Sequence, residues 1–321
     1  MRLSEGVDKY VARKRASGLV YTNAERRFLS FSRQMGEIEL DQITTEDLGR
    51  YLGEPEKMSA TWHANYLRLL RFFEYWTLQG AMPQLTMPQR PARARPTSCP
   101  YVYSLPEIRR LLDATAKNQM RRGCLIDPRT FRMYLILLYA TGTTIGELIG
   151  LKRADVNLRK RSIQLHNLKY GRFRQIPIGD DLRVLLGEFL RWRYRTRRKT
   201  EHLFTDRMGR PITAACLTCN FSKLRSIAGV MRRDGSKSQP RLLDFRDTFA
   251  VPRIAAWIKD GADLNRMLPA LAVYMGQVGL GSVESYLNVM PERFRKHLAF
   301  LSPKRGRKPR KSDPKFGAHQ N

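Results

Sequence analysis

Residues 133–148 have the sequence MYLILLYATGTTIGEL, and the apolar run from Met133 to Ala140 predicts a buried central helix. Gly142 follows this run, and glycine commonly ends a helix because it adopts a left-handed backbone conformation at little steric cost. The apolar residues from Ile145 to Leu151 predict a second helix directly after the turn. The sequence therefore predicts a helical core around residues 133–151.

The segments on either side of this core add more helices and a small sheet. Ser104 and Glu107 have the spacing of a capping box, which predicts the start of a helix. The spacing of the apolar residues then changes from that of a helix to that of strands. Ile163 and Leu165 are followed by the turn-like residues 169–172 and by Phe173, Ile176 and Ile178. We expect two strands around a turn, with Pro177 at an edge or a strand end, and helices again from Leu182. The predicted fold is mainly α with a small β-sheet.

The first 82 residues predict a small helical domain. Aromatic and apolar residues recur there at helical spacing: Trp62, Tyr66, Leu69, Leu70, Phe73 and Trp76. We interpret this stripe as hydrophobic core rather than as a platform for stacking bases, because it repeats along one packed helix face.

A proline-rich segment follows this domain. Residues 83–100 contain five prolines together with Arg90, Arg93 and Arg95, which predicts an extended basic linker. Residues 101–301 would form the second domain. The basic residues 302–321 lack apolar periodicity and predict a disordered tail.

The charge balance is strongly basic. The chain has 59 Lys and Arg against 29 Asp and Glu, a formal net charge of +30 at pH 7. Such an excess predicts a polyanionic partner, and basic groups on both domains and the linker suit double-stranded DNA. The candidate DNA contacts are Arg68 and Arg71, which lie off the apolar stripe, Arg90, Arg93 and Arg95 in the linker, and Arg172 in the predicted hairpin. The basic, aromatic run 191–199 is either part of this surface or a solvated helix end.

Apolar runs and cysteines indicate the compartment. The run 133–140 is too short to cross a bilayer, and the first residues do not lead into a signal-like apolar stretch. The four cysteines do not form a disulfide framework in a chain of this length. We therefore expect a protein of the reducing cytoplasm with no membrane partner.

Four blocks occur in a specific order along the second domain. Residues 140–148 read ATGTTIGEL, Lys169 lies in the hairpin that ends RQIPI at 174–178, residues 243–250 read LDFRDTFA, and residues 268–277 read LPALAVYMGQ, with Tyr286 nine residues later. Together they resemble the tyrosine recombinase (phage integrase) family over about residues 101–301. The last block is most similar to integrases of bacterial transposon-like elements. The resemblance implies a helical core-binding domain followed by an α/β catalytic domain.

The resemblance also implies a reaction. Family members break DNA through a 3′-phosphotyrosyl intermediate and rejoin it without a metal ion or another cofactor, acting as oligomers of recombinase subunits on DNA. By motif position Tyr286 would be the nucleophile, Lys169 the acid for the 5′ oxygen, and Arg246 a bidentate phosphate clamp. The expected location is the bacterial nucleoid.

Three positions depart from the family pattern. Thr144 stands in place of the first arginine, and Leu243 and Gln277 stand in place of histidines. Thr144 and Gln277 can still donate a hydrogen bond to a phosphate oxygen, whereas Leu243 cannot. Nearby basic residues, Lys152, Arg153, Arg172 and Arg241, could supply charge. Two hypotheses follow: an integrase with a partly lost catalytic set, or a DNA-binding subunit that no longer cleaves and acts with an active relative.

Other candidate groups give weaker signals. Cys216 and Cys219 have the spacing of half a zinc knuckle, but no further Cys or His completes a ligand set. We expect no metal site, and we place both cysteines on one buried helix face. Glu147 and Asp155 either orient arginines of the catalytic face or form surface pairs.

Overall fold

The computed structural model describes residues 1–53, 60–89, 100–120, 122–167, 172–196, 200–236, 238–277 and 286. The chain divides into two compact units, the first formed by residues 1–97 with 163–175 and the second by 98–162 with 176–321. Within the described ranges, none of the helices has the length and apolar character needed to span a membrane.

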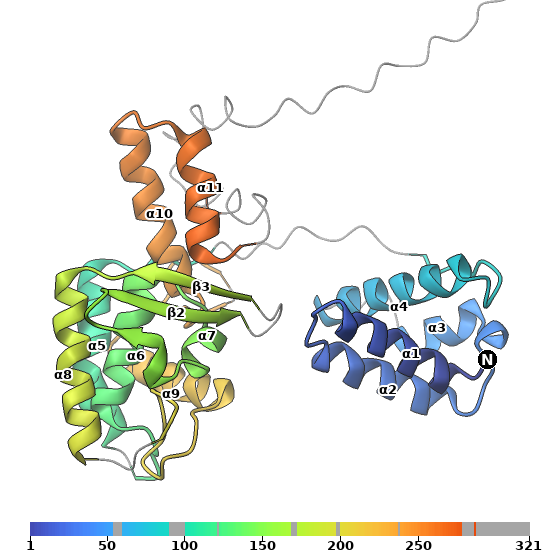
Figure 1. The fold of residues 1–321 in the computed structure, drawn as a ribbon, viewed down its shortest axis with the longest axis horizontal. Helices are drawn as coiled ribbons and strands as arrows, with labels where there is room; N and C mark the ends of the chain where they lie inside the picture. The colour runs from blue at the N-terminus through green and yellow to red at the C-terminus, as the bar shows by residue number, and fades with distance from the viewer. Residues whose placement is uncertain are drawn as a thin grey trace, which may run out of the picture. The chain divides into compact units, whose positions relative to one another are not determined.

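The first unit is built from helices (Figure 1). Its core is rich in aromatic side chains. The helices are α1 (Leu3–Ala16), α2 (Thr22–Met35), α3 (Thr45–Leu52) and α4 (Ala60–Leu78), with a short 3-10 turn at Leu40–Gln42. The predicted stripe of α4 lies in this core: Trp62, Tyr66, Leu69, Phe73 and Trp76 are buried, and Leu70 is half-buried. Tyr10 makes edge contacts with Phe28 and Phe72, which ties α1 and α2 to α4. The interpretation of the stripe as core is confirmed.

Residues 83–89, the described part of the predicted linker, contain no helix or strand. Leu85 and Met87 pack against the core of the first unit. The carbonyl oxygen of Thr86 accepts a hydrogen bond of 2.6 Å from the Thr45 hydroxyl on α3. The chain thus stays attached to the helical unit at least as far as residue 87.

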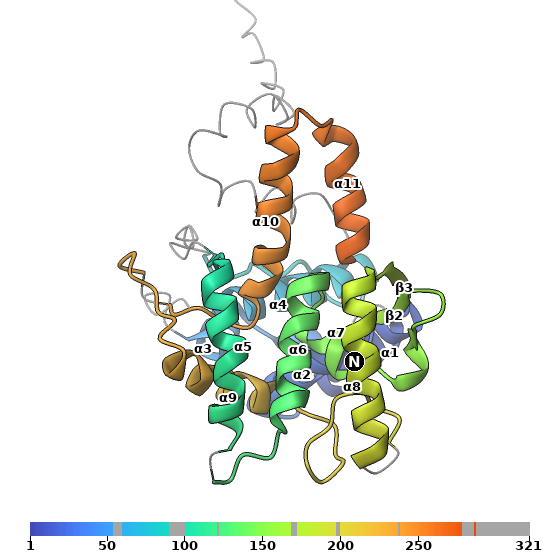
Figure 2. The same ribbon diagram turned by 90° about the vertical axis from the view of Figure 1, so that its left-hand side faces the viewer.

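The second unit is centred on α6 (Pro128–Thr141). The other helices are α5 (Leu105–Gln119), α7 (Ile145–Ile149), α8 (Asp180–Thr196), α9 (Ala214–Ile227), α10 (Asp244–Lys259) and α11 (Leu264–Met275), with a 3-10 turn at Arg153–Asp155. Figure 2 shows α6 between α5 and α8. Ser104 and Glu107 close the predicted capping box of α5, and Gly142 ends α6 in the left-handed conformation. Both predictions are confirmed.

The small sheet has three strands in the order β1-β2-β3. β2 (Ser162–Asn167) and β3 (Arg172–Pro177) are the predicted hairpin, and Pro177 is the last residue of β3, as expected. The two-residue strand β1 (Val156–Asn157) was not predicted, because so short a segment has no alternating pattern. The side chains of Ile163 and Leu165 on β2 are buried.

The helices α10 and α11 lie side by side in both ribbon views (Figures 1 and 2). The rings of Phe249 and Tyr274 stack between them, with centroids 5.5 Å apart and an interplanar angle of 5°. The Arg253 guanidinium lies over the Phe249 ring, with its carbon 3.7 Å from the ring centroid. This stack fixes the spacing of the two helices that bear the candidate site.

Two expectations for single side chains are wrong. Arg193, in the run predicted as a solvated or DNA-facing segment, is only 4% exposed. Its guanidinium donates to the Leu203 carbonyl and to the Thr205 hydroxyl, so it holds the loop after α8. Cys219 is exposed and Cys216 half-buried, so α9 does not bury both cysteines. The apolar positions of α9, led by Leu217, take the buried face instead.

Candidate active site

Arg246 connects the ends of two helices. Its Nη1 donates to the Gly142 carbonyl at 2.8 Å, and its Nη2 donates to the Met275 carbonyl at 2.7 Å. These carbonyls lie at the C-terminal ends of α6 and α11, where the helix dipole attracts a cation. Because a guanidinium has five N–H groups, three are not used by these two carbonyls and can reach further acceptors, the Tyr286 hydroxyl among them. The geometry holds one fixed positive charge at the point where α6, α10 and α11 meet.

The Tyr286 hydroxyl lies beside this charge. The Nε2 of Gln277 donates a hydrogen bond of 2.7 Å to the Tyr286 oxygen. Tyr286 is 5% exposed and packs against the apolar cluster of α10 and α11. Gly276 ends α11 in the left-handed conformation, and the backbone N–H of Gln277 then donates to the Ala272 carbonyl, which holds the Gln277 backbone against the end of the helix.

The environment acts on the acidity of two groups here. Burial raises the pKa of the Tyr286 phenol, while the Arg246 guanidinium and the Gln277 amide, which both reach it, act in the opposite direction. Burial, together with the neighbouring Asp244 carboxylate, raises the pKa of Asp247 to about 6. Among the described residues, the site thus combines the Arg246 cation and the Tyr286 phenol with the Asp247 carboxyl, whose pKa lies above its ordinary value.

The first departure, Thr144, has a structural role. Its hydroxyl donates to the Glu147 carboxylate at 2.9 Å and accepts from the Glu147 backbone N–H, a capping box at the start of α7. In this structure the single hydroxyl proton of Thr144 is directed to Glu147, and donation by Thr144 to a phosphate oxygen stays a prediction. Glu147 in turn serves as the partner of this cap.

The other departures differ from each other. Leu243 is the residue before α10 and is 48% exposed, with no polar group to offer. Gln277, in contrast, makes a direct contact with the candidate nucleophile. The sequence already distinguishes a side chain that can donate a hydrogen bond from one that cannot, and the structure adds the contact between Gln277 and Tyr286.

The nearby basic residues proposed as replacements are engaged elsewhere. Lys152 pairs with Glu201 at 2.9 Å, and Arg241 pairs with Asp244 at 3.0 Å. Arg153 donates to the Val156 carbonyl at 3.0 Å. These three cations stabilise local structure, so Arg246 is the basic side chain that the described part of the site brings to Tyr286.

Several predicted residues fall outside the description. Lys169, Arg90, Arg93, Arg95 and the tail 302–321 lie outside the described residues, as does the side chain of Arg172 at the start of β3. Asp155, expected to orient an arginine or to pair at the surface, accepts from the Lys152 backbone N–H. No group of metal-ligating side chains occurs among the residues that the structure covers.

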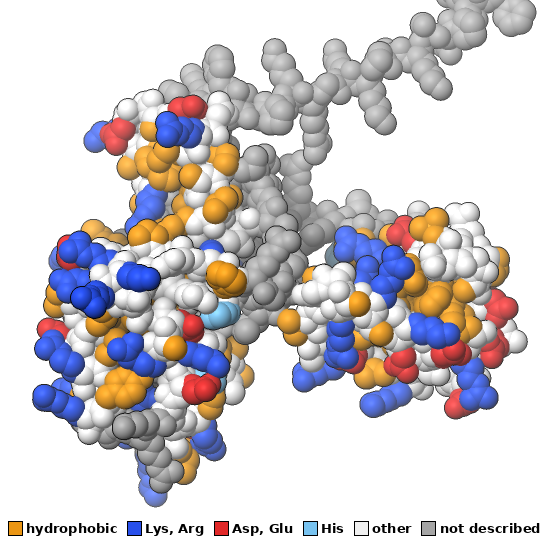
Figure 3. Space-filling view, in the orientation of Figure 1, with side chains coloured by type: hydrophobic (Ala, Val, Ile, Leu, Met, Phe, Trp, Pro, Cys, Tyr) orange, Lys and Arg blue, Asp and Glu red, His pale blue; other side chains and the backbone are white. Residues whose placement is uncertain are grey.

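The first unit presents cations along α4. Arg71 is exposed and Arg68 half-buried, one helical turn apart, and Arg68 donates to Asn65 at 2.8 Å. Arg27 of α2 lines the same small cavity as Arg68. Lysine and arginine side chains gather over α4 and α1 in the space-filling view (Figure 3).

Two cations of α1 extend this row. The Arg13 guanidinium lies 4.9 Å from the Tyr75 ring centroid, and the Lys14 ammonium lies 5.0 Å from that of Tyr10. The Tyr10 hydroxyl reaches the Arg71 carbonyl, which places this part of α1 beside the middle of α4. We call the set Arg13, Lys14, Arg27, Arg68 and Arg71 the basic ridge. The sequence did not reveal Arg13, Lys14 or Arg27, because their nearness to α4 is tertiary.

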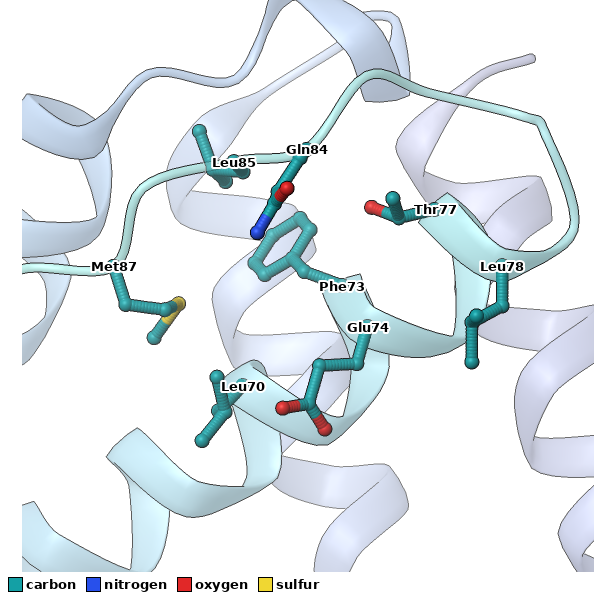
Figure 4. Close-up of a pocket in the computed structure, with 8 residues that line it drawn as sticks. All are labelled: Leu70, Phe73, Glu74, Thr77, Leu78, Gln84, Leu85 and Met87. Carbon is teal, nitrogen blue, oxygen red and sulfur yellow. The ribbon is translucent and has the colours of Figure 1, made fainter. Parts of the chain in front are cut away.

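The first unit also has a cavity of about 400 Å³ between α4 and the segment 84–87. Figure 4 shows Leu70 and Phe73 of α4 facing Gln84, Leu85 and Met87, with the Glu74 carboxylate at one side. A lining that is apolar apart from two uncharged polar groups and one carboxylate does not suit a phosphate. The cavity is separate in chemistry from the basic ridge.

Comparisons with known proteins show the family of the chain. The model of the phage integrase family matches residues 104–288, more than half of the chain. The chain belongs to this family. It is 27% identical over 297 residues to y4rB of Sinorhizobium fredii, named as an integrase/recombinase, covering 90% of this chain and 93% of that one. It is 24% identical over 263 residues to the tyrosine recombinase XerC of Staphylococcus saprophyticus, covering 81% and 82%.

Solved structures show the same fold. The Tn1549 transposon integrase in complex with a circular intermediate DNA matches with a TM-score of 0.63 at 16% identity, covering 94% of this chain and 100% of that one. The site-specific recombinase XerH bound to its difH substrate in a post-cleavage complex matches with a TM-score of 0.60 at 19% identity, covering 86% and 78%. The predicted family and the predicted mainly helical fold with a small sheet are confirmed.

Proposed function

We propose that this tyrosine recombinase is the integrase of a mobile element, and that it cuts and rejoins duplex DNA through Tyr286. The main support is the contact of the Tyr286 oxygen with Gln277 at 2.7 Å, beside the Arg246 guanidinium. A phosphate held by Arg246 would lie within reach of this oxygen. No described contact favours the alternative of a subunit that no longer cleaves.

The proposed step forms one bond and breaks one. Tyr286 Oη attacks the phosphorus as the bond from phosphorus to the 5′ oxygen breaks, which leaves a 3′-phosphotyrosyl link. The phenolic proton passes to water, and Lys169, carried over by motif position, supplies the proton of the leaving 5′ oxygen. Arg246 stabilises the negative charge that develops on the non-bridging oxygens. Attack by another 5′ hydroxyl reverses the step and rejoins DNA.

DNA binding has its own support in the charge. The net charge of +30 and the basic ridge suit a backbone contact with duplex DNA. Relatives of the same fold are described in complexes with DNA, one of them as a dimer on a core site. We therefore assign double-stranded DNA and further recombinase subunits as partners, on the bacterial nucleoid, with no cofactor.

We also propose the domain boundaries and the DNA-contacting residues of each segment. Residues 1–82 would be the core-binding domain, 83–100 the linker, 101–301 the catalytic domain and 302–321 a basic tail. Arg68 and Arg71 would contact DNA from the first of these domains, and Arg90, Arg93, Arg95 and Arg172 from the linker and the hairpin.

The test is capture of a covalent adduct. The binding site would first be selected from a pool of random duplexes with the full chain. It would then be nicked beside the cleavage position, so that the cut strand diffuses away and the adduct accumulates. Wild type should form an adduct, and Tyr286→Phe should bind DNA equally well and form none. Tyr274→Phe is the matched control, because it removes a hydroxyl from the neighbouring α11. An adduct that survives Tyr286→Phe, or a wild type that binds its site and never forms one, would refute the proposal.

A further inference from the structure

Two cysteine thiols from distant parts of the sequence contact the same side chain of α9. The Cys124 thiol donates a hydrogen bond of 3.2 Å to Oδ1 of Asn220, and Nδ2 of Asn220 donates one of 3.5 Å to Sγ of Cys216. Cys216 and Asn220 lie one turn apart on α9, whereas Cys124 lies in the connection between α5 and α6. Because both sulfur atoms contact one small carboxamide group, they lie near each other, and neither is bonded to another cysteine.

The connection that carries Cys124 is held in place beside α9. Gln119, at the end of α5, donates from Nε2 to the Ile126 carbonyl at 3.0 Å and so closes the loop around Cys124. Asn118 donates from Nδ2 to the Asn220 carbonyl at 3.4 Å, which joins the end of α5 to α9. The native fold therefore brings the two thiols together before any bond forms between them.

The pair has the chemistry of thiols rather than that of a metal centre. A structural zinc ion takes four ligands, and the described residues contain no group of three or more metal-ligating side chains. Both thiols are half-buried, so a small oxidant can reach them. Burial and the neighbouring Cys124 raise the pKa of the Cys216 thiol, which keeps this thiol protonated at neutral pH. In a reducing compartment, disulfides are typically transient and sense oxidants.

Cys219 is a further sulfur near Cys216 on α9, and it is exposed. Side chains three positions apart on a helix have Cβ atoms about 5–6 Å apart, whereas a disulfide needs about 3.5–4.5 Å. A bond from Cys216 to Cys219 would therefore distort the helix. A bond from Cys216 to Cys124 requires the half-buried Asn220 amide to turn aside, which leaves the helix intact.

We propose that Cys124 and Cys216 are a redox-sensitive pair, which a hydroperoxide converts into a disulfide that links the α5–α6 connection to α9. One sulfur attacks an oxygen of the hydroperoxide, the O–O bond breaks, and the departing oxygen takes the proton of that thiol. The other sulfur then attacks the sulfenic acid, so that the S–S bond forms as the S–O bond breaks. The departing hydroxide takes the second thiol proton and leaves as water. The two thiols lose two electrons, and the hydroperoxide gains them.

This inference does not depend on the proposed function. None of the contacts described for the two thiols involves Arg246 or Tyr286. A protein that forms no adduct with DNA would still form the disulfide, and a protein that forms no disulfide would still cut DNA through Tyr286.

The experiment oxidises the full chain in the absence of DNA. Protein purified under reducing conditions would be treated with hydrogen peroxide, alkylated, digested and mapped by mass spectrometry. Wild type should give a pair of peptides joined through Cys124 and Cys216. Cys219→Ser is the matched control, because it removes a thiol from the same helix and should leave this link unchanged. A link between Cys216 and Cys219, or separate sulfinic acids at Cys124 and Cys216, would overturn the proposal.

Melting temperature gives a second measurement. A disulfide that closes a long loop restricts the unfolded chain, so oxidised wild type should melt roughly 5–10 °C above its reduced form, and dithiothreitol should reverse the shift. Cys124→Ser should melt at the same temperature with and without peroxide. A melting temperature of wild type that stays constant or falls on oxidation would show that the bond does not form within the native fold, and would overturn the proposal.

Discussion

Gly142→Ala is expected to be a severely damaging single substitution in the second unit. Gly142 has a φ of +59°, which residues other than glycine rarely adopt. A Cβ at this position would lie 2.5 Å from Cδ1 and 2.7 Å from Cγ of Phe249. Phe249 is 3% exposed and stacks on Tyr274, so the ring has little room to move away. One methyl group therefore meets both a backbone and a packing constraint.

The expected loss follows from these two constraints. A left-handed backbone costs a residue with a Cβ about 1–2 kcal/mol, and overpacking of a tight core costs about 1–3 kcal/mol more. Gly142→Ala should therefore lose roughly 2–5 kcal/mol of unfolding free energy. Gly229→Ala is the matched control, because Gly229 has a φ of +61° and no atom within 4 Å of its would-be Cβ. It should lose only the backbone share, about 1–2 kcal/mol.

Urea unfolding followed by circular dichroism would measure both losses. The Gly142 carbonyl also accepts from Arg246, so displacement of this turn should slow adduct formation in Gly142→Ala and leave it unchanged in Gly229→Ala. Adding Phe249→Ala opens the space, and the double variant should lose less than the two single losses combined. Equal losses in Gly142→Ala and Gly229→Ala would refute the packing part of this reasoning.

Three further outcomes are expected. Arg246→Lys should lose about 1–3 kcal/mol in urea unfolding and most adduct formation, because one ammonium cannot replace a fork that bonds two carbonyls at 2.8 and 2.7 Å. Asp247→Asn should stabilise the protein by an amount that grows as the pH rises from 4 to 6 and is then constant, because the raised pKa of Asp247 means that ionisation of this carboxyl opposes folding over that range. The gain in unfolding free energy should reach about 1 kcal/mol and should appear as a higher melting temperature. Equal melting curves for wild type and Asp247→Asn at pH 7.5 would contradict this. Changing Arg68 and Arg71 together to Gln should make the plot of the log of the DNA-binding constant against the log of the salt concentration less steep by roughly 2, as measured by fluorescence anisotropy. An unchanged slope would show that neither arginine contacts DNA.

Local patterns in the sequence were sufficient for most helices and for the hairpin. The capping box of Ser104 and Glu107 and the glycine that ends α6 depend on hydrogen bonds between residues a few positions apart, so sequence spacing predicts them. The alternation around Ile163 and Leu165 predicts a strand for the same reason. The family resemblance added the expectation of a helical core-binding domain followed by an α/β catalytic domain.

Side-chain partners could not be predicted in this way. Thr144 was expected to face a phosphate, but the capping box that it forms with Glu147 was recognisable in principle from their three-residue spacing. Arg193 is buried because distant loop carbonyl and hydroxyl groups need a donor, which no local pattern shows. The contact of Gln277 with Tyr286 likewise depends on how the chain returns to the end of α11 after nine residues.

The two hydrogen bonds that Arg246 makes to Gly142 and Met275 affect how degenerate relatives should be interpreted. An arginine that donates to the carbonyl groups at two helix ends stabilises the fold, so its loss would destabilise even a protein that no longer cuts DNA. Its retention in a relative therefore does not distinguish an active enzyme from an inactive descendant. The hydrogen bond between the Gln277 amide and the Tyr286 hydroxyl joins no helix ends, and a phenylalanine at 286 would keep the packing of the ring against α10 and α11. Decay of activity should therefore first become visible in the loss of that hydroxyl.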